Sequence, residues 1–264
     1  MPRILLFWVG QASWPVLNMG EDVQPVQLKS ETLQAFEAYI RDAEAAMEQT
    51  LRGDGFLWSE GEPKRAKQVR QGKVVADLWQ GKSPAKIPAG LIHDWIGAVF
   101  IPGANVARVL ARIQDYDNYK NLYRPEVMDS KLIARRGDDF QIYLRVLKKK
   151  IVTVVLDTDH DVHYFHVDGA RWGCRSYTTR TAEVDDAGKP KEKVYPPDTG
   201  YGFLWRLYSY WRFEERDGGV CAECRAISLT RDIPTVLKWI VEPMVRSLPK
   251  DTLMHTLKAT RDAV

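Results

Sequence analysis

The chain has 264 residues, which allows one large domain or two small ones. Apolar residues make up 45% and charged residues 28%, and 38 Lys and Arg against 35 Asp and Glu leave a net charge of +3. This near balance argues against a protein whose main work is to bind nucleic acid. The chain contains no run of about 18 apolar residues, so no transmembrane segment is predicted, while peripheral contact with a membrane stays open.

The first 27 residues predict the remnant of an export signal followed by a linker. An apolar run at 4–9 follows Arg3, and Gly10, Gln11 and Ala12 fit the small-x-small pattern of a cleavage site. A signal needs roughly 15–30 residues, so cleavage after Ala12 comes too early. Either the true start lies upstream, or the run is a short strand of a cytoplasmic protein. We favour export over the cytoplasm.

Residues 28–90 read as an N-terminal extension with one long helix. That helix begins at Ser30 and carries an apolar stripe with spacings of three and four, formed by Leu33, Phe36, Ile40, Ala43 and Met47. Two strand-like runs, 56–58 and 74–79, flank the basic stretch 64–73. Glycines and prolines between 81 and 90 mark a boundary. The chain is therefore divided into 1–27, 28–90 and 91–264.

Residues 91–264 follow the order strand, two short helical pieces, many strands and one long helix. The helical pieces fall at 104–114 and 115–125, and a polar loop at 185–200 interrupts the strands. The expected strands are 91–101, 127–134, 139–148, 151–157, 162–168, 171–184, 203–215 and 219–229. The closing helix begins after Asp232, and we expect Pro243 to bend it and Pro249 to break or restart it.

This order, together with several short segments, resembles the START-like (SRPBCC, pollen-allergen-like) superfamily over about residues 91–262. The segments are 95–104, the pair Val109 and Leu110, the stretch 115–119, residues 127–132 and the closing helix at 236–261. The resemblance implies an α+β helix-grip fold, in which a curved antiparallel sheet grips the C-terminal helix. It also implies a cavity between the two for an apolar ligand. Residues 28–90 match nothing in that superfamily.

A hairpin is predicted at 203–229, because Asp217 and Gly218 form a strong two-residue turn signal. Its register pairs residues whose numbers sum to 435. One face then pairs Trp211 with Cys224, Phe213 with Ala222 and Ser209 with Ala226. The other face pairs Arg212 with Glu223, Tyr210 with Arg225 and Tyr208 with Ile227. We assign the first face to the concavity beneath the helix and the second to solvent or a partner.

The predicted ligand-binding residues come from this hairpin and from the closing helix. They are Trp205, Leu207, Trp211, Phe213, Trp239, Ile240 and Met244. Ordinary core packing is the competing interpretation for all of them.

Other chemistry-bearing residues favour structural roles. Cys221 and Cys224 form a C-x-x-C pair, but on a strand they point to opposite faces, and Cys174 supplies only a third thiol. Three histidines at 160, 163 and 166 lie in a polar hairpin, and the run 148–150 suits a solvated strand edge. His93 and Asp94 are read as structural. No phosphate loop, dinucleotide fingerprint or nucleophile elbow occurs, so no cofactor, metal or catalytic residue is predicted.

Three functions remain in competition. The first is binding or transfer of an apolar small molecule, lipid or polyketide-like, in the cavity. The second is a cyclase or aromatase, which would need the polar set of Arg206, Tyr208, Tyr210, Arg212 and Glu223 to turn inward through a one-residue slip of the hairpin. The third is an interaction module that docks a partner through the extension.

Overall fold

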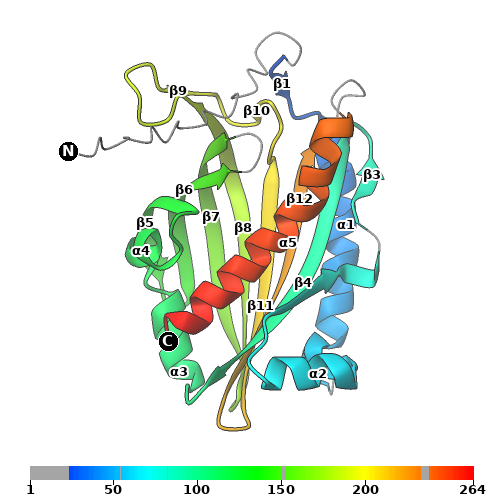
Figure 1. Cartoon of the computed structure of the whole chain (residues 1–264), viewed down its shortest axis with the longest axis vertical. Coiled ribbons are helices and arrows are strands. Elements are labelled where there is room, and N and C mark those ends of the chain that lie inside the picture. Colours follow the sequence, from blue (N-terminus) through cyan, green and yellow to red (C-terminus); the bar gives the residue numbers. More distant parts are fainter. Residues whose placement is uncertain (1–23, 54, 82, 150–152, 233–237) are drawn as a thin grey trace, which may run out of the picture.

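A ten-stranded antiparallel sheet with a helix on each face organises the protein (Figure 1). The computed structural model describes residues 24–264 apart from 54, 82, 150–152 and 233–237, and it describes no side chain within 238–246. The main path of the sheet runs β2-β4-β12-β11-β8-β7-β6-β5, with β3 beside β4 and β9 beside β8. The strands are β2 (Val75–Leu78), β3 (Ala85–Ile87), β4 (Gly90–Pro102), β5 (Val127–Arg136), β6 (Asp139–Lys149), β7 (Thr153–Asp168), β8 (Arg171–Asp185), β9 (Lys193–Val194), β11 (Arg206–Arg216) and β12 (Gly219–Arg231).

Two further strands, β1 (Val26–Gln27) and β10 (Thr199–Gly200), pair with each other outside the main sheet. The α-helices are α1 (Ser30–Gln49), α2 (Pro63–Arg70), α3 (Val106–Ile113), α4 (Tyr119–Leu122) and α5 (Lys238–Asp262). The 3-10 helices are η1 (Trp58–Gly61), η2 (Trp79–Gly81) and η3 (Tyr116–Asn118). Within the described part of the chain, no helix combines the length and apolarity needed to cross a bilayer.

The β11–β12 hairpin has the predicted register. Trp211 lies opposite Cys224 and Arg212 opposite Glu223. Asp217 and Gly218 both adopt positive φ, at 52° and 76°. A two-residue turn of this kind matches the twist of the flanking strands and therefore fixes their pairing.

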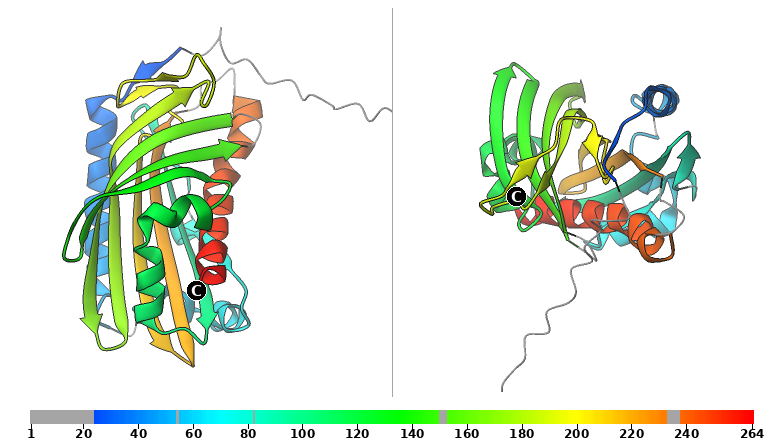
Figure 2. Two further views of the ribbon diagram at one scale, coloured as in Figure 1. Left: turned by 90° about the vertical axis from the view of Figure 1, so that its left-hand side faces the viewer. Right: turned by 90° about the horizontal axis from the view of Figure 1, so that it is seen from above.

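The helix α5 lies in the concavity of the curved sheet, which confirms the predicted helix-grip arrangement (Figure 2). Leu253 and Leu257 are buried there in one core cluster with Val99 and Phe213. Gly97 on β4 allows the close approach, because a Cβ on it would lie 2.7 Å from Leu257 Cδ1 and 2.8 Å from the Val75 carbonyl oxygen. The helix continues through Pro249. The expected break there is wrong, since the packing of Leu253 and Leu257 stabilises the helix beyond the proline.

The extension 28–90 covers the opposite, convex face of the sheet. Phe36 and Ile40 of α1 pack in one cluster with Ile92, Ile227 and Leu229. Figure 2 shows α1 and α5 on opposite sides of the sheet, and β2 and β3 lengthen the sheet beyond β4. The prediction that this face meets solvent or a partner is corrected, because the chain's own extension covers it.

The buried charges of the convex face are paired within this layer. Arg225 donates to both carboxylate oxygens of Asp94, at 2.9 and 2.6 Å, and the Tyr39 hydroxyl donates to the same carboxylate at 2.7 Å. Glu223 accepts the backbone N–H groups of Trp58 and Ser59 at 2.7 and 2.6 Å. In the sequence these opposite charges indicated a solvated surface. In the structure, the charged side chains instead form hydrogen bonds that help to attach the extension to the sheet.

Some boundaries differ from the expectation. The two strands expected at 151–157 and 162–168 are one strand, β7. The strand-like run 56–58 leads into η1, and the basic stretch 64–73 forms α2. The linker and the polar loop contribute β1 and β10. The apolar run 4–9 lies outside the described residues, so the export signal stays a prediction.

Candidate functional site

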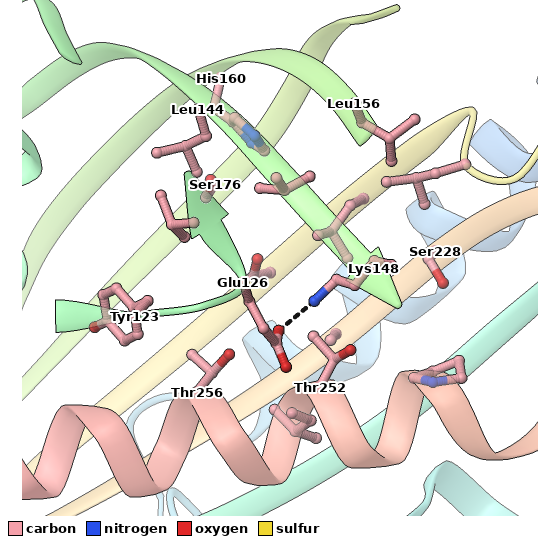
Figure 3. Close-up of a pocket in the computed structure, with 18 of the residues that line it drawn as sticks. Tyr123, Glu126, Leu144, Lys148, Leu156, His160, Ser176, Ser228, Thr252 and Thr256 are labelled. Carbon is pink, nitrogen blue, oxygen red and sulfur yellow. Dashed lines mark hydrogen bonds and ion pairs between the residues drawn. The ribbon is translucent and has the colours of Figure 1, made fainter. Parts of the chain in front are cut away.

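A cavity of about 370 Å³ lies between the concave face of the sheet and α5. Figure 3 shows Leu144 and Leu156 of the sheet facing Thr252 and Thr256 of α5 across it. Its walls are mainly aliphatic and aromatic, and side chains from β6, β7, β8, β11 and β12 contribute to them. The alternation of each strand places every second residue on this wall.

The structure places the predicted binding residues whose side chains it describes in three groups. Leu207 and Trp211 line the cavity. Phe213 is fully buried in the core beside it, where side chains of α3 and α5 fill the concavity. Trp205 lies in the α1 cluster on the opposite face. The side chains of Trp239, Ile240 and Met244 fall outside the described part of the chain.

Trp205 was predicted to line the cavity, and the structure places it on the opposite face of the sheet. The residue precedes β11, which begins at Arg206, and so the strand alternation does not extend to it. Trp205 as a whole residue is 3% exposed, and it packs in one cluster with Phe36 and Ile92. The pairing rule that placed Leu207 and Trp211 correctly holds only inside the strand.

Tyrosines from the helical segment after β4 close part of the cavity. The hydroxyls of Tyr116 and Tyr164 lie 2.8 Å apart, and the hydroxyl of Tyr123 lies 3.0 Å from Thr260 Oγ1. Tyr119 donates to the carbonyl of Ile113. Burial raises the pKa of Tyr116, Tyr119 and Tyr164 well above the ordinary value of 10. These groups are neutral phenols that already have partners.

One ion pair belongs to the wall. Lys148 donates to the carboxylate of Glu126, as Figure 3 shows, and Glu126 Oε1 also lies 3.5 Å from Nδ1 of His255. Burial lowers the pKa of Lys148, and the charge of Glu126 opposes that shift. The prediction that Lys148 belongs to a solvated edge is corrected. The alternation that sends Ile142 and Leu144 inward also turns Lys148 toward the cavity, and this signal was present in the sequence.

Three histidines, His93, His160 and His255, line the cavity, and sequence reasoning placed none of them there. His93 on β4 is 1% exposed and His160 on β7 is 6% exposed. Burial lowers the pKa of each to about 4. His163, on the other face of β7, is exposed and bonds Asp139 at 2.7 Å. Asp94 faces the convex layer, so it does not orient the neighbouring His93.

The three cysteines are free and divided between the two faces. Cys174 and Cys224 line the cavity, whereas Cys221 packs in a cluster with Phe56 and Val69. The two thiols of the C-x-x-C pair therefore point to opposite faces, as expected. Burial raises the pKa of Cys174 and Cys221 to about 12, which keeps both as thiols at neutral pH.

The polar set required by a cyclase or aromatase lies on the convex face. Arg212 donates to the carbonyls of Phe56 and Met47 at 2.6 and 2.7 Å, and Glu223 holds η1. The Tyr210 hydroxyl donates to Glu44 of α1 at 2.9 Å. Arg206 donates to Asp198, and Tyr208 packs edge-on against Phe36. The one-residue slip that would turn this set into the cavity does not occur.

Of the comparisons with known proteins, only the one with solved structures found matches. No family model matches the chain, and no curated protein matches it. A STAR-related lipid transfer protein from Xanthomonas axonopodis is 18% identical, with 71% of this chain and 97% of that chain covered and a TM-score of 0.44. For human STARD10 the identity is 13%, the coverage 92% and 83%, and the TM-score 0.43. For the Zhui aromatase/cyclase from Streptomyces sp. R1128 the identity is 10%, the coverage 65% and 92%, and the TM-score 0.43.

The fold follows from the strand order and the position of α5. The first strand of residues 90–262, β4, pairs with the last, β12, and the main path then continues through β11, β8, β7 and β6 to β5 at the far edge. The last helix lies across the concave face. Residues 90–262 thus have the START-like helix-grip fold that the sequence resemblance predicted.

Proposed function

We propose that this protein binds or carries an apolar small molecule, lipid or polyketide-like, in the cavity between the sheet and α5. The observation that carries the proposal is the cavity itself, about 370 Å³ in volume with mainly aliphatic and aromatic walls. Small-molecule sites usually occupy roughly 300–1,000 Å³ and have walls of this kind.

The physical argument concerns what fills such a space. Protein interiors are close-packed, and voids larger than a water molecule are few. Leu144, Leu156 and Leu207 border this space instead of packed protein, so their side chains make fewer dispersion contacts than they would in a filled core. An apolar guest restores these contacts and removes its own surface from water, so both terms favour binding.

A substitution that fills the cavity tests the proposal. Leu207→Trp adds bulk to the wall, and we expect it to weaken binding of a fluorescent fatty acid by about tenfold or more, since overpacking costs about 1–3 kcal/mol. Ile133→Trp is the matched control, because Ile133 is 60% exposed on β5 and the same bulk there leaves the cavity unchanged.

Native mass spectrometry of the gently purified protein provides a second readout. We expect an apolar compound to remain bound to the unaltered protein and to Ile133→Trp, and to be depleted in Leu207→Trp. Equal occupancy and equal affinity in all three proteins would contradict a site in this cavity.

A further inference from the structure

The cavity wall carries hydroxyl groups that are bonded to no other group of the described residues. Ser176, Ser209 and Ser228 line it from the sheet, and Thr252 and Thr256 line it from α5. In the part of the chain that the structure describes, none of these five side chains makes a hydrogen bond. Their oxygens also differ from the ring nitrogens Nδ1 of the three cavity histidines, which are sealed from water. These hydroxyls are therefore polar groups of the wall that a guest can reach.

The two threonines lie one turn apart on the same face of α5. Figure 3 shows both side chains pointing from the helix toward the sheet. A helical threonine often gives its proton to the carbonyl four residues earlier, and Thr260 does so to Thr256 at 2.8 Å. Thr252 and Thr256 make no such bond within the described residues, so each hydroxyl offers the cavity one donor and its acceptor lone pairs.

Two of the serines lie opposite each other on neighbouring strands. Ser176 on β8 is the direct partner of Ser209 on β11. The Cβ atoms of such a pair are roughly 4.5–5.5 Å apart, so a single polar group of a guest can reach both hydroxyls. The neighbouring Thr178 is different, because its hydroxyl already donates to the carbonyl of Leu207 at 2.6 Å.

The formal charges of the wall balance. Lys148 and Arg231 line the cavity with positive charge, and Glu126 and Asp232 line it with negative charge. Lys148 is paired with Glu126, and Asp232 forms an ion pair with Lys86 at 3.2 Å. Because burying an unpaired charge is costly, this wall suits an uncharged guest better than an ionised one.

The hydroxyls discriminate between classes of uncharged guest. A hydrocarbon would displace water from them and leave them unpaired, which reduces its affinity. A carbonyl oxygen accepts from a wall hydroxyl, and a guest hydroxyl both donates and accepts. Either group replaces the hydrogen bonds to water that are lost when the guest enters.

We propose, on the basis of the proposed function, that the natural guest is an uncharged apolar molecule whose hydroxyl or carbonyl oxygens bond the serines of the sheet and the threonines of α5. This specifies an oxygenated neutral compound in preference to a plain hydrocarbon or an ionised fatty acid.

Two naphthalenes of nearly equal size test the role of the oxygens by equilibrium dialysis at pH 7.5. The probes are 2,6-dihydroxynaphthalene and 2,6-dimethylnaphthalene, and the measured quantity is the ratio of their affinities. One variant combines Thr252→Val with Thr256→Val, a second combines Ser176→Ala with Ser209→Ala, and a third carries all four substitutions. We expect the ratio to fall about three- to tenfold for each hydrogen bond removed, while dimethylnaphthalene binds as tightly as before or more tightly.

Thr179→Val is the matched control, because Thr179 is exposed on β8, the strand that carries Ser176. This variant should have the same ratio as the unaltered protein. Binding of dimethylnaphthalene shows in each case that the cavity is intact. An unchanged ratio in the variant with all four substitutions, with dimethylnaphthalene still bound, would overturn the inference.

A second pair of probes tests the charge of the guest on the unaltered protein. The probes 2-acetylnaphthalene and 2-naphthoate share the ring system and a carbonyl group, but only naphthoate is ionised at pH 7.5. We expect the ketone to bind about tenfold or more tightly than the anion. Equal or tighter binding of naphthoate would overturn the assignment of an uncharged guest.

Dimethylnaphthalene also separates this inference from the proposed function. If it binds and the four substitutions leave the ratio unchanged, the cavity is an apolar site and only the oxygen requirement fails. If none of the four probes binds and no compound co-purifies with the protein, the proposed function fails as well.

Discussion

Two buried histidines of the cavity wall, His93 and His160, connect the protein's stability to pH. Each has a pKa of about 4 in the folded protein against an ordinary value of 6.5. The unfolded chain therefore takes up protons at a higher pH than the folded chain does. Their contribution to stability is present above about pH 6.5 and is lost as the pH falls toward 4.

We expect the free energy of unfolding to decrease below pH 6.5 by about 1.4 kcal/mol per pH unit for each histidine. Urea denaturation at pH 7.5, 6.0 and 5.0 measures this slope in the unaltered protein and in a variant with both His93→Gln and His160→Gln. Carboxylates that titrate in the same range are common to both proteins and cancel in the difference. His163→Gln serves as the control, and identical slopes in all three proteins would refute the assignment.

The contact between α5 and β4 depends on the absence of one side chain. A methyl group at Gly97 would collide with Leu257 Cδ1 and with the backbone of Val75, which cannot easily retreat. We therefore expect Gly97→Ala to destabilise the protein by about 1–3 kcal/mol. Thermal unfolding measures the effect, and Gly53→Ala is the control because a Cβ there meets nothing within 4 Å. Equal melting temperatures for the two variants would contradict this account.

Local signals in the sequence predicted the elements well. The turn at Asp217 and Gly218 fixed the hairpin register, because a two-residue loop leaves the strands no freedom to shift. Alternation then placed Leu207 and Trp211 on the cavity wall, and it failed for Trp205, which lies before the strand. The same alternation would have placed Lys148 on the wall, had the lysine run not suggested a solvated edge.

Contacts between remote segments were beyond local reasoning. The pairs Arg212–Glu223 and Tyr210–Arg225 look the same in the sequence whether they face water or a distant helix. Only the fold shows that α1 and η1, more than 160 positions earlier in the chain, cover them. The apolar stripe of α1 indicated that this helix packs against another part of the protein. The residues near α1 in the sequence did not indicate that this part is the convex face of the sheet.

We expect the extension and the sheet to fold as one unit, because the extension packs over the convex face. Removing residues 1–90 would uncover Ile227 and Leu229, and it would deprive the buried Glu223 of the two N–H groups that it accepts. An uncovered apolar face loses its hydrophobic stabilisation and promotes aggregation, so we expect residues 91–264 alone to be insoluble or unfolded. Soluble yield and circular dichroism measure this outcome.

Co-expression of residues 1–90 as a separate chain is the control for this truncation, and we expect it to restore the soluble fraction. A soluble, cooperatively folding 91–264 fragment would instead show that the extension is dispensable for the fold, as an interaction module would be.

The alternation along β11 and β12 also bears on how this protein can change over evolutionary time. Neighbouring positions face different surroundings: Trp211 meets the cavity, whereas Arg212 holds the extension. Related sequences should therefore vary in two interleaved patterns. Cavity positions such as 207, 209 and 211 would diverge with the compound carried, while positions 210, 212 and 223 would change together with α1 and η1. Substitutions at the cavity positions can in this way change the guest without altering the contacts between the sheet and the extension.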